Sequence, residues 1–183
     1  MKSTSRPSPA RASRTAAAIL AFACAGLLSA CASFEGSGLV PGQSGAADVE
    51  AVMGPAAEKR VISGGETAYY YPRLPWGYAT YVARIGADGR LVALEQRLTL
   101  ENTDKLIVGA TRAEQIRELL GPPFEPMKQQ LSGKDIWTYP MRIPGYPTPR
   151  WFLVQLTPDG VLSEKYFIDD PNWVQRDSPG RFR

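Results

Sequence analysis

Two stretches of the chain, 67 positions apart, follow the same 14-residue plan. The first runs from Gly42 to Pro55 and the second from Gly109 to Pro122. Each begins with Gly, carries Ser or Thr two residues later, has apolar residues near its middle and ends in Gly-Pro. Self-similarity at a fixed spacing is the signature of a duplicated structural unit. The chain is therefore expected to fold as two copies of one unit.

The second copy contains a complete helix signal. Thr111 and Glu114 have the spacing of a capping box, in which the two side chains accept from backbone N–H groups at the helix start. Ala113, Ile116 and Leu120 recur at helical spacing, and the Gly-Pro that follows ends the helix. We therefore predict one short helix at the start of each copy.

Four strands are predicted after each helix. Runs rich in β-branched and aromatic residues, separated by Gly-Gly, Asp-Gly and Pro-rich turns, are typical of antiparallel hairpins. The predicted strands are residues 58–63, 67–72, 78–85 and 90–98 in the first copy and 127–131, 135–139, 150–156 and 161–168 in the second, with a hairpin turn at Ser132-Gly133. The predicted fold class is α+β, with two tandem repeats, each a short helix followed by a four-stranded antiparallel meander.

The repeats are assigned to residues 42–106 and 107–173, followed by a loose tail at 174–183. Each repeat has about 60 residues, a size at which a single hydrophobic core is marginal. We therefore expect the two repeats to bury a shared surface and form one body. Aromatic residues that alternate along the strands are expected to pack in the core or on a sheet face: Tyr69, Tyr71, Trp137 and Tyr139.

The first 30 residues have the pattern of an export signal. A leader with four basic residues and no acid precedes an apolar run at residues 15–28, which is too short to span a bilayer. Leu28-Ser29-Ala30-Cys31 then resembles the lipobox of bacterial lipoproteins, which implies cleavage before Cys31 and acylation of that residue. Residues 31–41 are rich in Gly, Ser and Pro and are expected to form a flexible tether. The alternative is an ordinary signal peptide, or a buried apolar helix, with a chance cysteine.

The lipobox resemblance also implies a location. In many Gram-negative bacteria an Asp after the lipidated Cys retains a lipoprotein in the inner membrane, and this chain has Ala32 there. This implies lipid anchoring in the outer membrane, facing the periplasm.

The chain carries 21 Lys and Arg against 18 Asp and Glu, and four of the basic residues lie in the leader. The processed chain would be close to neutral, so no nucleic-acid partner is predicted.

The available residue types argue against catalysis. The chain has no His, and its only cysteines are Cys24 in the predicted signal and Cys31. The processed chain therefore lacks a Ser-His-Asp triad, a free thiol nucleophile and the usual zinc ligands. No Gly-rich nucleotide-binding motif occurs, so we expect no enzyme, no cofactor and no metal. Four carboxylates near the ends of the copies are expected to lie in solvated turns and not in a catalytic or calcium site: Glu101, Asp104, Asp169 and Asp170.

The loop between the second and third strands of each copy is the candidate binding surface. Both loops contain Pro, which lowers the entropy lost on docking, together with the Trp, Tyr and Arg residues that dominate binding hot spots. Alternatively, the aromatic side chains fold back as lids over two small cores. The candidate partner-binding residues are Pro75, Trp76, Gly77 and Tyr78 in the first copy and Pro144, Gly145, Tyr146 and Trp151 in the second.

Together these motifs resemble the SmpA/OmlA (BamE-like) family of small outer-membrane lipoproteins. Besides the lipobox, the resemblance is carried by Gly109, Thr111, Gln115-Ile116 and Leu120 to Pro123, followed by Trp137-Thr138-Tyr139 and Trp151-Phe152-Leu153. It implies an accessory role in outer-membrane protein assembly or envelope maintenance, with an envelope protein such as the β-barrel assembly machine as partner. The tandem form is similar to the β-lactamase inhibitor protein architecture, which implies the alternative of an inhibitor or sensor of an envelope enzyme.

Overall fold

The computed structural model describes residues 35–124, 126–128 and 134–176. The predicted signal at residues 1–30, the lipidation site Cys31 and residues 177–183 of the tail lie outside the described residues, as does the turn at Ser132-Gly133. Among the helices that the structure describes, none combines the length and apolar character needed to cross a membrane.

The described chain is a mixed α+β structure with two antiparallel sheets. The sheets have the strand orders β1-β2-β3-β4 and β5-β6-β7-β8, so each strand pairs with its neighbour in sequence. The elements are α2 (Ala46–Met53), β1 (Glu58–Val61), β2 (Thr67–Pro72), β3 (Thr80–Ile85), β4 (Leu91–Gln96), α3 (Leu100–Asp104), α4 (Ala113–Leu120), β5 (Pro126–Lys128), β6 (Asp135–Met141), β7 (Arg150–Leu156), β8 (Leu162–Asp169) and α5 (Pro171–Arg176). The predicted α+β class with antiparallel meanders is confirmed.

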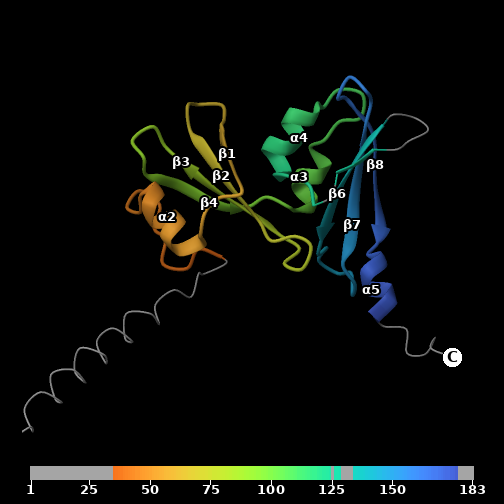
Figure 1. The fold of residues 1–183 in the computed structure, drawn as a ribbon, viewed down its shortest axis with the longest axis horizontal. Helices are drawn as coiled ribbons and strands as arrows, with labels where there is room; N and C mark the ends of the chain where they lie inside the picture. Colours follow the sequence, from red (N-terminus) through yellow and green to blue (C-terminus); the bar gives the residue numbers. More distant parts are fainter. Residues whose placement is uncertain (1–34, 125, 129–133, 177–183) are drawn as a thin grey trace, which may run out of the picture.

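Helices and sheets alternate in layers, as Figure 1 shows. On one face of the first sheet, Val49 and Met53 of α2 pack in one core. The opposite face of the same sheet carries Tyr70 and turns toward α4, because successive side chains of a strand point to opposite faces. Ile116 and Leu120 of α4 then pack in the core of the second sheet. Thus α4 lies between the two sheets and holds the halves together.

The sequence does not predict α3 and α5. The single turn of α3 has no apolar period, and it is capped by Thr99, whose hydroxyl accepts from the N–H of Asn102 at 3.3 Å. At the start of α5, Oδ1 of Asp170 accepts from the N–H of Asn172 at 2.9 Å. This helix continues to Arg176, three residues beyond the expected end of the folded body.

The start of α4 differs from the predicted capping box. The N–H of Arg112 donates to Oε1 of Gln115 at 2.8 Å, so Gln115 and not Glu114 provides the reciprocal cap. The hydroxyl of Thr111 instead accepts from the N–H four residues earlier at 2.7 Å. Arg112 also forms a β-bridge to the segment before β8, which keeps its backbone extended. A tertiary contact therefore sets the helix start, and the predicted capping box is wrong.

The same local hydrogen bonds precede α2. The hydroxyl of Ser44 accepts from the N–H four residues earlier at 2.9 Å, and Oδ2 of Asp48 accepts from the N–H of Gly45 at 2.8 Å. Ser44 and Asp48 lie 67 residues before Thr111 and Gln115, which make the matching contacts in the second half. The helix starts of the two halves therefore share one hydrogen-bond pattern.

Polar contacts also join α4 to the first sheet. The Tyr70 hydroxyl donates to the carbonyl oxygen of Glu118 at 3.0 Å, and the Arg117 guanidinium lies 2.7 Å from a carboxylate oxygen of Glu58. A partly exposed ion pair contributes only about 0.2–1 kcal/mol. Burial around α4 is therefore the main source of stability between the halves.

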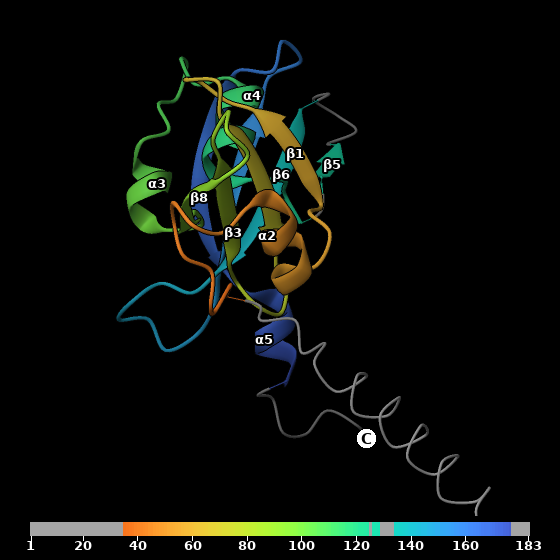
Figure 2. The same ribbon diagram turned by 90° about the vertical axis from the view of Figure 1, so that its left-hand side faces the viewer.

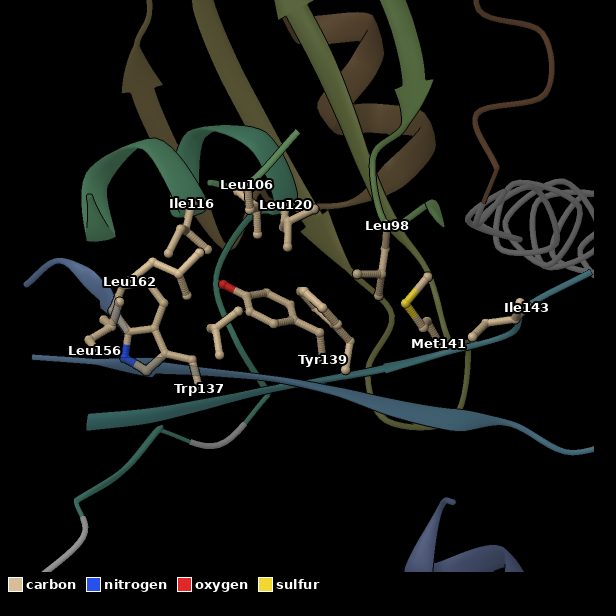
Figure 3. Close-up of a cluster of buried hydrophobic side chains, with 12 residues drawn as sticks. Leu98, Leu106, Ile116, Leu120, Trp137, Tyr139, Met141, Ile143, Leu156 and Leu162 are labelled. Carbon is tan, nitrogen blue, oxygen red and sulfur yellow. The ribbon is translucent and has the colours of Figure 1, made fainter. Parts of the chain in front are cut away.

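The largest core cluster lies between α4 and the second sheet (Figure 3). Tyr139 is fully buried there, and its hydroxyl donates to the carbonyl oxygen of Gly121 at 3.1 Å. Tyr71 and Trp137 are also buried, so the expectation that these three aromatic residues lie in the core is confirmed. Tyr69 is half-buried, with the Lys59 ammonium 4.3 Å from its ring centre.

Residues 35–41 belong to the folded body and not to a flexible tether. Leu39 packs against the core of the first half, and the N–H of Gly42 donates to the carbonyl oxygen of Leu91 at 2.8 Å. The predicted tether at 31–41 is therefore wrong for its last seven residues. Burial of an apolar side chain outweighs the flexible character that the Gly and Ser content indicates.

The buried Tyr71 hydroxyl predicts a loss of stability at high pH. Burial, with a smaller contribution from the Glu50 carboxylate, raises the pKa of Tyr71 from 10 to about 12. As the pH rises above 10, the unfolded chain releases this proton before the folded chain does. The free energy of unfolding then falls by about 1.4 kcal/mol per pH unit until the folded pKa is reached.

Urea unfolding across this pH window checks the prediction, with Tyr71→Phe as the comparison. The buried Tyr71 hydroxyl has no hydrogen-bond partner among the described residues, so its removal should keep or raise the stability at neutral pH. The variant is expected to lose less stability than the wild type above pH 10. Equal losses would contradict the assignment.

Candidate binding surface

Both candidate loops lie at one end of the molecule. The β2–β3 loop (residues 73–79) and the β6–β7 loop (residues 142–149) leave their sheets at the lower end of Figures 1 and 2. The described chain also begins there, at Glu35, and α5 lies at the same end. Successive connections of an antiparallel meander lie at opposite ends of the sheet, so the β1–β2 turn is at the far end. We call the surface formed by the two loops and Glu35 the loop end.

The β2–β3 loop is held in a defined shape. The N–H of Gly77 donates to the carbonyl oxygen of Arg73, and the N–H of Arg73 donates to that of Ala79 at 2.9 Å. A Cβ on Gly77 would lie 2.5 Å from the Cβ of Arg73, so the tight turn requires glycine. Leu74 packs against the core of the second half, whereas the Trp76 side chain is 65% exposed. The loop therefore presents Trp76 from a fixed base.

Tyr78 ties this loop to the second half. Its hydroxyl donates to Oδ2 of Asp170 at 3.3 Å, and Asp170 is only 3% exposed. The Arg142 guanidinium lies 5.2 Å from the ring centre of Tyr78 and 5.6 Å from that of Trp173. Contacts of this kind between a guanidinium and an aromatic face are attractive. Tyr78 is therefore held against the second half of the molecule.

A groove of about 550 Å³ lies beside Trp76. Its wall combines aromatic and aliphatic side chains with one guanidinium and one carboxylate, contributed by Glu35, Arg73, Leu74, Trp76, Gly77 and Tyr81. Nη2 of Arg73 donates to the carbonyl oxygen of Met53 at 3.2 Å, which fixes the guanidinium in the wall. Burial, with a smaller contribution from the Glu35 carboxylate, raises the pKa of Tyr81. Tyr81 is therefore an uncharged phenol at neutral pH.

The β6–β7 loop presents Tyr146, whose side chain is 54% exposed. The N–H of Tyr146 donates to the carbonyl oxygen of Ile143 at 3.1 Å, and Ile143 is buried in the second core. The Arg150 guanidinium lies 5.3 Å from the Tyr146 ring centre and also contacts Oδ1 of Asp169 at 3.2 Å. The exposed Tyr146 ring is therefore packed against the Arg150 guanidinium, which the Asp169 carboxylate holds in place.

The structure divides the candidate residues into two sets. The exposed set is Trp76, Gly77, Pro144, Gly145 and Tyr146, and the partly buried set is Pro75, Tyr78 and Trp151. The Trp151 Nε1 is buried, with no hydrogen-bond partner within the part of the chain that the structure describes. Tyr78 and Trp151 therefore match the interpretation as lids. Trp76 and Tyr146 have the exposure that docking requires.

Three residues at the loop end were not predicted from the sequence: Glu35, Tyr81 and Trp173. Leu74 and Arg142 lie within the two predicted loops but were not among the candidate binding residues. The strand period of β3 could have indicated Tyr81, whose side chain points to the same face as that of Ala83. No local spacing relates position 78 to position 170, because 92 residues separate the two. Only the tertiary fold brings these positions together.

The four carboxylates noted in the sequence do not form a common site. Glu101 and Asp104 lie on α3, where Glu101 pairs with Lys105 at 2.9 Å, while Asp169 ends β8 and Asp170 follows it. Asp170 is buried, so the expectation of a solvated turn is wrong for this residue. Among the described residues, no group of three or more His, Cys, Asp or Glu could hold a metal ion.

No protein-family model matches this chain, and no curated protein matches it. Two solved structures show a distant likeness. A DUF4309 family protein (YjgB) from Bacillus subtilis is 17% identical with a TM-score of 0.30, covering 73% of this chain and 84% of its own. A "putative beta-lactamase inhibitor protein" from Streptococcus mutans is 15% identical with a TM-score of 0.28, covering 69% of this chain and 83% of its own. At these values the likeness assigns neither a family nor a function to this chain.

Proposed function

We propose that this chain is a lipid-anchored, non-enzymatic binding protein on the periplasmic face of the outer membrane. It would act as an accessory factor in outer-membrane protein assembly or envelope maintenance. The lipobox ending in Cys31 and the motifs shared with the SmpA/OmlA family support the location and the process. The lipid would concentrate the folded body at the membrane, so that a modest docking affinity suffices for a partner held there.

The exposed aromatic residues at the loop end carry the proposal. Trp76 and Tyr146 are 65% and 54% exposed, on loops that are anchored to the second core by the partly buried Leu74 and the buried Ile143. A rigid loop loses little entropy on docking. Trp and Tyr are also the residues most often found at binding hot spots. The loop end is therefore the proposed docking surface.

We further propose that the two halves are copies of one ancestral unit. The shared hydrogen bonds at the starts of α2 and α4 and the identical strand order of the two sheets support this. A duplicated unit places equivalent loops at the same end of the body. Duplication would thus have doubled the number of aromatic side chains available to one partner.

Replacement of Cys31 by Ala is expected to move the protein from the membrane fraction to the soluble periplasmic fraction. Each buried CH₂ of an acyl chain contributes about 0.8 kcal/mol to membrane attachment, and this variant loses all of them. The matched control is Cys24→Ala, which alters the other cysteine inside the predicted signal. Membrane fractionation that is unchanged by Cys31→Ala would contradict the anchor.

The double variant Trp76→Ala/Tyr146→Ala is expected to lose at least tenfold of its captured partner from detergent-solubilised envelopes, since a hot-spot truncation costs about 2 kcal/mol or more. Mass spectrometry of the captured proteins, normalised to bait, provides the measurement. Val61→Ala is the control, because Val61 is 78% exposed at the far end from the loops. If the double variant retained its partners at wild-type levels, the loop end would not be the docking surface.

The identity of the captured partner separates two functions. Recovery of β-barrel assembly proteins is the expected outcome for an accessory factor in outer-membrane assembly. Recovery of one envelope enzyme, with those proteins missing, would favour the alternative of an inhibitor or sensor. The two loops at one end would suit that alternative too, because two copies of a unit present one extended surface.

A further inference from the structure

We propose that the groove beside Trp76 lies against the phospholipid bilayer, so that the first half rests on the membrane surface. This inference rests on the proposed lipid at Cys31. It narrows the proposed docking surface: the groove and Trp76 contact lipid, and the Tyr146 loop, on the second half of the loop end, contacts the protein partner. The loss of partner expected for the Trp76→Ala/Tyr146→Ala variant in detergent then comes from Tyr146→Ala.

The distance from Cys31 to the folded body carries the argument. Glu35 lines the groove, and only three residues separate it from Cys31. Four residue steps of fully extended chain span at most about 14 Å. The headgroup layer between hydrocarbon and water occupies about 5–8 Å of that span. Even a fully extended linker therefore holds the groove within several ångströms of the bilayer surface.

The side chains at the groove have the character of a membrane interface. Trp76 is the most exposed aromatic side chain among the described residues, and Tyr81 forms another part of the same wall. Trp and Tyr concentrate where hydrocarbon meets headgroups, because their rings are apolar and their N–H or O–H groups remain hydrated. Arg73 provides a guanidinium, a group that binds phosphate oxygens well. These residues face the side from which the anchored segment enters.

The rest of the fold is compatible with this orientation. The β1–β2 turn lies at the far end of the first sheet, where it would point into the periplasm. The β6–β7 loop lies at the loop end but to the side of the β2–β3 loop in Figure 2. Tyr146 would therefore meet a partner that is itself embedded in, or bound to, the same membrane.

Quenching of tryptophan fluorescence by brominated lipids tests the contact. The lipidated protein is reconstituted into vesicles of phosphatidylethanolamine and phosphatidylglycerol that carry bromine on their acyl chains. The wild type is compared with Trp76→Phe, and with Trp76→Phe/Val61→Trp, which moves the exposed indole to the far end. We expect the brominated lipids to quench part of the tryptophan fluorescence of the wild type. Trp76→Phe should lose this quenched component, and Trp76→Phe/Val61→Trp should not regain it.

Equal quenching in the wild type and Trp76→Phe, with both proteins bound to the vesicles, would overturn the bilayer contact and leave the lipid anchor intact. Failure of the wild-type protein to remain on vesicles would overturn both. Protection of Trp76 from acrylamide in native envelopes, without quenching in brominated vesicles, would assign the groove to a protein and overturn the proposal. Circular dichroism of each variant confirms that it is folded.

Discussion

Replacing Leu120 with Ala is expected to lower the free energy of unfolding by about 3–5 kcal/mol. Leu120 is fully buried in α4, within the core that joins this helix to the second sheet (Figure 3). The substitution removes three side-chain carbon atoms and leaves a cavity that the surrounding strands can fill only in part. Because folded domains are stable by only about 5–15 kcal/mol, this single change would remove much of the total.

Leu119→Ala provides the matched comparison for this effect. Leu119 is the adjacent residue of the same helix, and it is only partly buried against the same core. Both variants replace one helical Leu by Ala, so helix propensity changes equally. Urea unfolding should show the larger loss for Leu120→Ala. Equal losses would mean that burial at this position does not control stability.

Replacing Gly121 with Ala is the second change with a large expected effect. Gly121 ends α4 with φ 85° and ψ −173°, a conformation open almost only to glycine, and adopting it costs other residues about 1–3 kcal/mol. The new Cβ would also lie 2.7 Å from Cγ2 of Thr80 and 3.2 Å from Cδ1 of Tyr70, both in the first half. Such forced packing adds about 1–3 kcal/mol. The variant should therefore separate the halves or shift α4.

Gly54→Ala isolates the backbone contribution. Gly54 ends α2 with φ 83° and ψ −177°, and a Cβ there would meet no atom within 4 Å. Only the conformational cost is expected at this position. Thermal or urea unfolding should therefore show a greater loss for Gly121→Ala than for Gly54→Ala. Equal losses in the free energy of unfolding would mean that close packing at Gly121 does not help to hold the two halves together.

Most helices and strands could be predicted from local sequence. The predicted strands at 67–72 and 150–156 coincide with β2 and β7, because alternation and turn residues are local signals. The helix ending at Gly121 was also predicted, since its apolar spacing and Gly-Pro stop lie within one short segment. Helices α3 and α5, which depend on distant contacts, were not predicted. Each is held by a cap and by packing, and neither has an apolar period of its own.

The candidate site was predicted as two loops but not as one surface. Local composition indicated aromatic residues in both loops, yet it could not distinguish Trp76 from Tyr78. The difference arises because Asp170 and Arg142 of the second half contact Tyr78, whereas the Trp76 side chain remains 65% exposed. Composition also indicated a flexible tether up to residue 41, whereas the burial of Leu39 leaves only a short linker before Glu35.

By itself the sequence determined the alternation of short helices with antiparallel strands and the positions of two aromatic loops. These features depend on side-chain period and turn geometry, which act over a few residues. Only the tertiary structure decided that α4 lies between the two sheets, where the helix starts, and which aromatic rings remain exposed. Those outcomes depend on contacts between segments far apart in the chain, and packing and burial there outweigh local preference.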